Sequence, residues 1–331
     1  MQEIIKEYLE KAKVGRKQVY KNMAVFPLLS DYSLISDYIL LDEALGSGLI
    51  EVTEVDNHGA VPNLKVHNKS PRMVLILDGE ELVGAKQNRI VNTTILVAGN
   101  ATVIIPVSCV EQGRWAYKTP QFYSEKRLMP SRMRAMKSEQ VLCSVKARGE
   151  YQADQSALWA DISERANRRD AMSPSMAMSS IYEKDLPSLQ EYLEHFSLIG
   201  SQVGAVFLIN GKVVGMDAFG KPETFSKTFK KLVESYALDA VDWLEEGKDY
   251  KASRSEVTKF IQGTLTCPLE TRAAVGLGTD CRLDSGKLTG FALSLDDKVV
   301  HMSIFARFDG VKGESQTSRM ARYSRRSWNR V

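Results

Sequence analysis

The chain has 331 residues, of which 44% are hydrophobic and 26% charged, proportions that are ordinary for a globular protein. No apolar run approaches the ~20 residues of a membrane-spanning helix, and the first residues lack the apolar core of a signal peptide, so we expect a cytoplasmic protein without a membrane partner. The net charge of +3 hides two basic segments on an acidic body, because residues 112–148 carry +7 and residues 311–331 carry +5.

These two basic segments have two interpretations. Basic clusters attract phosphates, so nucleic acid or an acidic protein is a candidate partner through residues 112–148 and 311–331. Alternatively, each segment is solvated and flexible and pairs with the acidic surface, which the sequence favours for either segment alone. The sequence does not indicate an oligomeric state.

The first half of the chain is predicted to be mostly β. Residues 2–13 have the spacing of an amphipathic helix, and Met23–Leu29 resembles a strand in which Pro27 favours an edge position. A short helix is predicted at Tyr38–Leu45. Strand candidates then lie between Gly, Asn, Asp and Pro clusters, at Leu49–Val55, Leu64–Val66, Met73–Leu77, Thr94–Val97 and Ala101–Val107. This pattern predicts an antiparallel, sandwich- or barrel-like region.

The second half mixes helices with antiparallel strands. Residues 116–150 have weak periodicity and are predicted as a long connection. A strand–turn–strand unit is predicted at Ala205–Ala218, because Asn-Gly between apolar runs favours a hairpin turn. Helices are predicted over residues 152–171 and 186–196 and from Pro222 onward, and further strands at Ala273–Gly276, Leu288–Leu295 and Val299–Phe305. The fold class is therefore α+β, divided into residues 1–150, 151–310 and a basic tail at 311–331, or one continuous domain.

The densest group of polar residues is DGEELVGAKQNR at 78–89. Glu80 and Glu81 are adjacent, so in an extended strand they point to opposite faces. Lys86 and Arg89 have the charge to grip a diphosphate while a carboxylate holds ribose hydroxyls. A solvated turn and an exposed polar loop are equally consistent with this composition.

A second motif, PVSCVEQGRW, occupies residues 106–115. The neighbouring Glu111 disfavours a thiolate, so Cys109 is assigned to packing. Glu111 and Arg114 are better ligand-binding candidates, and Trp115 offers a ring for stacking, although a Trp is more often in a core. The four cysteines form no CxxC pair and the four histidines lack metal-ligand spacing, so we expect reduced thiols and no zinc site. A metal held mainly by carboxylates stays open, as does any cofactor.

The segments GEELVGAKQNR, NTTILV and PVSCVEQGRW resemble the ARG- and rhodanese-phosphatase-superfamily-associated protein family, in which ARG stands for ADP-ribosylglycohydrolase. AVFLINGKVVGMDAFG and the Arg-rich end also look similar. The resemblance implies an association, by genomic context, with ADP-ribose and NAD-derived metabolites. The positions that it implies are Glu80, Glu81, Lys86, Gln87, Asn88, Arg89, Glu111, Arg114 and Trp115.

Three hypotheses follow. The first is binding or processing of a nucleotide-like, ADP-ribose- or NAD-derived ligand; an enzyme of this kind would be a hydrolase in which Glu81 and Glu111 cleave a glycosidic bond. The second is a non-catalytic module that binds ADP-ribosylated protein or nucleic acid. The third is a structural role, in which the polar residues tie strands together or stabilise an oligomer.

Overall fold

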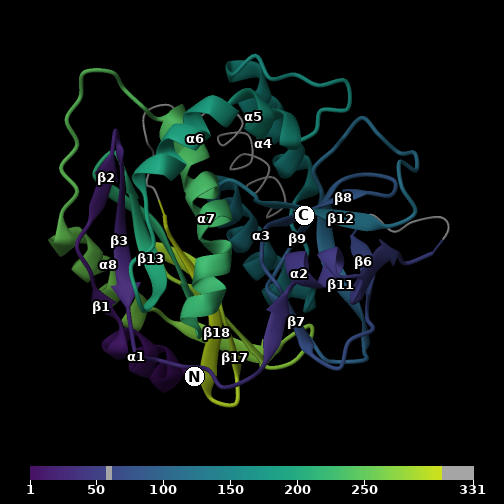
Figure 1. Cartoon of the computed structure of the whole chain (residues 1–331), viewed down its shortest axis with the longest axis horizontal. Coiled ribbons are helices and arrows are strands. Elements are labelled where there is room, and N and C mark those ends of the chain that lie inside the picture. Colours follow the sequence, from purple (N-terminus) through teal and green to yellow (C-terminus); the bar gives the residue numbers. More distant parts are fainter. Residues whose placement is uncertain (57–61, 308–331) are drawn as a thin grey trace, which may run out of the picture.

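The computed structural model describes residues 1–56 and 62–307. Its largest sheet has nine strands, joined by antiparallel pairs, and combines the N-terminal strands with those that follow residue 200 (Figure 1). The order is β1-β3-β13-β14-β18-β17-β16-β15, with β2 also paired to β3. The strands are β1 (Lys13–Val14), β2 (Gln18–Tyr20), β3 (Met23–Leu29), β13 (Gln202–Ile209), β14 (Lys212–Phe219), β15 (Leu269–Ala273), β16 (Thr279–Asp284), β17 (Leu288–Leu295) and β18 (Lys298–Ala306).

Strand β3 is not the edge strand that Pro27 suggested. It pairs with β13 on one side and with β1 and β2 on the other. Pro27 lies between the residues of β3 that pair with β1 and those that pair with β2, and its carbonyl accepts from Gly15 N at 2.7 Å. The missing proline N–H therefore interrupts no ladder, which is why this residue is tolerated inside the sheet.

The predicted hairpin is confirmed in β13 and β14. The turn residues Asn210 and Gly211 both have positive φ, 50° and 75°, as this two-residue turn requires. The turn between β17 and β18 uses Asp296 and Asp297 in the same way. The strand predicted at Ala273–Gly276 is wrong, because β15 ends at Ala273 and the next residues turn into β16.

The β-rich region between residues 38 and 128 contains two smaller sheets. One is antiparallel, in the order β12-β8-β9-β11-β6-β5; the other is β10-β7-β4, in which β4 and β7 are parallel. The six-stranded sheet curls around an apolar interior, and Gln121, just before β12, donates to Glu51 of β5 at the opposite edge. The strands are β4 (Tyr38–Leu40), β5 (Ile50–Glu54), β6 (Asn63–Asn68), β7 (Met73–Ile76), β8 (Glu80–Gly84), β9 (Arg89–Val91), β10 (Ile95–Val97), β11 (Thr102–Cys109) and β12 (Phe122–Leu128).

The long connection predicted over residues 116–150 is wrong, because this segment contains β12 and the 18-residue helix α3 (Ser131–Arg148). The buried face of α3 mixes Met133 and Val141 with Arg134 and Lys137. Arg134 bonds to Asp217 of β14 at 2.6 Å, and Lys137 bonds to Asp78. Because of these ion pairs, cations occupy positions of the buried face that are usually apolar. The apolar spacing that normally identifies a helix in a sequence is therefore interrupted in α3.

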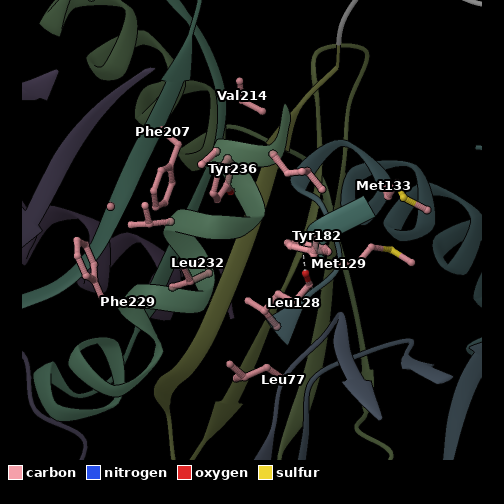
Figure 2. Close-up of a cluster of buried hydrophobic side chains, with 14 of the residues drawn as sticks. Leu77, Leu128, Met129, Met133, Tyr182, Phe207, Val214, Phe229, Leu232 and Tyr236 are labelled. Atoms are coloured by element: carbon pink, nitrogen blue, oxygen red, sulfur yellow. Dashed lines mark hydrogen bonds between the residues drawn. The ribbon is translucent and has the colours of Figure 1, made fainter. Parts of the chain in front are cut away.

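Helix α7 (Pro222–Asp242) packs against β13 of the large sheet and β12 of the curled sheet, and it stands between them in Figure 1. Figure 2 shows part of the core around it, where the Phe207 and Tyr236 rings stack 3.8 Å apart and the Tyr182 hydroxyl donates to the Leu128 carbonyl. The remaining helices are α1 (Gln2–Lys11), α2 (Leu41–Gly46), α4 (Gln155–Arg168), α5 (Ser179–Lys184), α6 (Leu186–His195) and α8 (Arg254–Leu265). Helices α5 and α8 were not predicted.

The predicted α+β class is confirmed by these mixed helices and mostly antiparallel strands. The division at residue 150 stays a prediction, although the large sheet takes strands from both sides of it. Within the described ranges, no helix is long and apolar enough to cross a membrane. The basic segment at 311–331 lies outside the described residues.

Candidate functional site

Two strand ends of the curled sheet bring the predicted motifs together. Strand β9 pairs with β8 on one side and β11 on the other, and Arg89 lies directly opposite Cys109. The loop from Ala85 to Asn88 joins β8 to β9 and is closed over by residues 114–119: Lys118 N donates to the Ala85 carbonyl at 2.9 Å. The polar block and PVSCVEQGRW therefore form one end of the curled sheet, which we call the barrel end.

Glu80 is apart from the other predicted site residues. Its carboxylate bonds to Lys231 of α7 and accepts from Leu77 N at 2.8 Å, and Lys231 also bonds to Asp42 at 2.8 Å. Burial raises the pKa of Glu80. These bonds tie β8 to α7, so the side chain is occupied in holding the two elements together.

Glu81 is fully buried on the face of β8 that carries Ile90 of the neighbouring strand. Its nearest charge is Arg127 Nη1 at 3.6 Å, and neither carboxylate oxygen has a hydrogen-bond partner within the described part of the chain. Burial raises the pKa of Glu81 to about 7, and the negative charge of Glu111 contributes to that rise. Glu81 therefore holds a proton more readily than an ordinary glutamate.

Glu111 lies in the opposite electrostatic situation. It accepts from Arg114 at 2.7 and 3.0 Å and from Asn88 N at 3.1 Å. Burial alone would raise the pKa of Glu111, but the bonds from Arg114, Ser175 and Asn88 outweigh it and hold the pKa below its usual value. At neutral pH this carboxylate is ionised while that of Glu81 is partly protonated.

Arg114 organises the loop around Glu111. Besides that carboxylate, its guanidinium donates to the carbonyls of Gly84, Ala85 and Ala116 and to Asn88 Oδ1 at 3.1 Å. These bonds use most of its donors, so in this arrangement Arg114 positions the loop rather than presenting itself to a ligand.

Arg89 and its neighbours line the interior of the barrel end. Arg89 Nη1 donates to Gln87 Oε1 at 2.8 Å, and the Cys109 thiol donates to the same oxygen at 3.1 Å. Burial lowers the pKa of Arg89 and raises that of Cys109, so Cys109 acts here as a neutral thiol that packs and orients Gln87. Arg89 is fully buried, yet its Nε and Nη2 have no hydrogen-bond partner among the described residues.

Two exposed aromatic rings cover these cations. Trp115 is 48% exposed and Tyr117 is 53% exposed, and Lys86 Nζ lies 5.3 and 5.2 Å from their ring centroids. The Arg89 guanidinium lies 5.6 Å from the Trp115 centroid. Aromatic faces above cations form a platform that suits a flat ring with an anion attached. The sequence hypothesis did not include Tyr117, although an aromatic two residues after Trp115 was a usable signal.

The hypothesis also missed Glu54, the last residue of β5. Ile50, Val52 and Glu54 alternate with partly exposed residues along β5, and the first two belong to the apolar interior of the curled sheet. Glu54 is only 6% exposed, and its charge acts on Arg89. The sequence did contain a signal for this residue, because the alternation of β5 places an acid at an interior position where an apolar residue is usual.

Two cavities lie away from the barrel end. One of about 900 Å³ is lined by Phe260 and Leu288 with Lys259 and Lys287 at α8 and β17, and a smaller one of about 210 Å³ lies beside Thr224 at the start of α7. Among residues 1–56 and 62–307, no group of three His, Cys, Asp or Glu side chains is placed to hold a metal ion.

Comparison with known proteins places most of the chain in one family. The model of the ARG and Rhodanese-Phosphatase-superfamily-associated Protein domain matches residues 11–305. No curated protein and no solved structure matches the chain. The match spans both the curled sheet and the large sheet, so the family domain includes the barrel end.

Proposed function

Because the chain belongs to the ARG and Rhodanese-Phosphatase-superfamily-associated Protein domain family, we propose that it binds an ADP-ribose-type ligand at the barrel end. The observation that carries the proposal is the exposed platform of Trp115 and Tyr117 above two buried cations. One of these cations, Arg89, has two donor nitrogens that no described residue bonds to. The family name links these proteins to ADP-ribosylglycohydrolases, enzymes of ADP-ribose chemistry, which is why the ligand is drawn from that class.

Each part of the platform matches one part of such a ligand. The adenine stacks on the exposed ring of Trp115, an interaction worth roughly 1–3 kcal/mol per base. The diphosphate accepts from Arg89, whose Nε and Nη2 have no hydrogen-bond partner within the described ranges. Lys86 adds positive charge 5.3 Å from the Trp115 ring. Charge-assisted bonds of this kind are stronger than neutral ones, and burial strengthens them further.

A second candidate is hydrolysis of a glycosidic bond, favoured by the opposite pKa shifts of Glu81 and Glu111. Environments that separate the pKa values of two carboxylates produce an acid and a base at the same pH. Glu81 would give its proton to the leaving group while Glu111 takes one from the attacking water. Glu81 and Arg89 lie on opposite faces of the curled sheet, because Glu81 is paired with Ile90 and Arg89 with Leu82. This reaction therefore needs a ligand that reaches both faces of the sheet at the ends of these strands.

The structural alternative is favoured by the bonds of Arg114, which link Glu111, Asn88 and two loop carbonyls without any ligand. It predicts that substitutions in the barrel end change stability and leave every ligand measurement unaffected.

Calorimetric titration of the protein with ADP-ribose, NAD, AMP and adenosine tests the proposal. We expect ADP-ribose to bind and Trp115→Ala to weaken its binding about tenfold or more. Arg89→Met should weaken the binding of ADP-ribose more than the binding of adenosine, because adenosine lacks phosphate. Lys230→Met, an exposed charge on α7, is the matched control and should leave binding unchanged. Absence of binding by the unaltered protein overturns the proposal, and chromatography of the same mixtures reports whether the ligand is cleaved.

A further inference from the structure

Glu54 is a buried acid without a hydrogen-bond partner among residues 1–56 and 62–307. Neither of its carboxylate oxygens has a hydrogen-bond partner among the described residues, although both are buried. An unpaired carboxylate in a protein interior costs several kcal/mol relative to one in water. The fold does not need an acid at this position, since Ile50 and Val52, at the other interior positions of β5, are apolar.

Glu54 shares the interior of the curled sheet with Arg89. Both side chains lie on the face that carries Leu82 and Val91, and the charge of Glu54 acts on the guanidinium. The described structure gives no ion pair between them within 4.0 Å, and each keeps unused bonding atoms: two acceptors on Glu54 and two donor nitrogens on Arg89. Because Glu54 and Arg89 form no ion pair with each other among the described residues, the unused atoms of both are available to a third group that bonds to each.

We infer that Glu54 binds the vicinal hydroxyls of a ribose whose phosphate is held by Arg89. This inference rests on the proposed function and names the part of the ligand that the interior of the barrel end recognises. A carboxylate offers two acceptor oxygens, and a vicinal diol offers two donors at a matching separation. Arg89 supplies the donors that a phosphate requires, so the two residues together select a ribose phosphate over a phosphate alone.

The matching of donors and acceptors also sets the specificity. A site built to bond a hydroxyl discriminates strongly against a ligand without it, because the buried acceptor is then left unpaired. Ligands that lack one hydroxyl of the diol should therefore bind about tenfold or more weakly.

The test measures preference among three ligands: ADP-ribose, its 2′-deoxy analogue, and ADP, which lacks the second ribose. The unaltered protein should bind ADP-ribose about tenfold or more tightly than at least one of the other two. In Glu54→Gln that preference should fall to about threefold or less, because an amide offers only one acceptor oxygen. Glu51→Gln, the same change on an outward-facing residue of the same strand, is the matched control and should keep the preference.

Preference is a ratio within one variant, so a change in stability alone does not alter it. Binding without preference in the unaltered protein, or a preference that Glu54→Gln retains, overturns the inference while the proposed function stands. No binding of any of the three overturns both.

Discussion

Replacing Glu81 by glutamine should stabilise the protein at pH 8 much more than at pH 4.5. The carboxyl is fully buried and burial raises its pKa from 4.5 to about 7, whereas in the unfolded chain it ionises near its ordinary value. Between these two values the folded protein keeps a proton that the unfolded chain has released. The contribution of Glu81 to stability is therefore complete below the unfolded pKa and is lost as the pH rises through the folded pKa.

The size of the effect follows from the shift. Each pKa unit corresponds to about 1.4 kcal/mol, so the shift is worth roughly 3 kcal/mol. Glutamine fills nearly the same volume as glutamate and cannot ionise. The free energy of unfolding of the Glu81→Gln variant therefore lacks this contribution to the pH dependence. The free energy of unfolding of Glu81→Gln, minus that of the unaltered protein, should consequently grow by about 3 kcal/mol between pH 4.5 and pH 8.

Urea denaturation at several pH values measures this difference directly. Glu246→Gln, a substitution at an exposed position after α7, is the control and should give a difference that is flat with pH. If the Glu81→Gln difference is also flat, Glu81 is ionised in the folded protein at neutral pH, and the proton-donor role in the hydrolysis candidate fails with it.

Three further predictions concern stability. Arg134→Met and Asp217→Asn should each lower the free energy of unfolding by about 3–5 kcal/mol, because each removes the nearest opposite charge of a buried ion. The double substitution should cost less than the sum of the two, and additive costs in urea denaturation would contradict this coupling. Arg114→Met should destabilise by about 3 kcal/mol and raise the pKa of Glu111, measured by NMR titration of the carboxyl; an unchanged pKa would show that other groups set it. Gly211→Ala should cost about 1 kcal/mol in thermal or urea unfolding, because φ is +75° there, and a neutral result would mean that the turn relaxes.

Local signals made part of the fold predictable. The Asn210-Gly211 turn and the apolar spacing of α7 are encoded within a few residues, and both elements are present in the structure. Helix α3 was missed because Arg134 and Lys137 lie on its buried face, and their partners are 83 and 59 residues away in sequence. A buried cation cannot be distinguished from an exposed one until its partner is known.

The same distinction applies to the candidate site. The motifs located the barrel end, since Arg89 and Cys109 are paired across β9 and β11 and Asn88 bonds to Glu111. The sequence did not reveal that Glu80 is bonded to Lys231, 151 residues later, or that Arg114 is occupied by loop carbonyls. Local pattern therefore indicates where polar groups gather, and long-range packing decides which of them keep unused bonding capacity.

The pairing of β3 with β13 has a consequence for the order in which the protein is made. Phe26 of β3 faces Val206 of β13, so the ribosome must add about 180 residues before this neighbour exists. At about 5–20 residues per second, that delay lasts roughly 10 to 40 seconds. During this time the buried strand MAVFPLL has an unsatisfied edge toward β13, and it is the segment that a nascent-chain chaperone would need to cover.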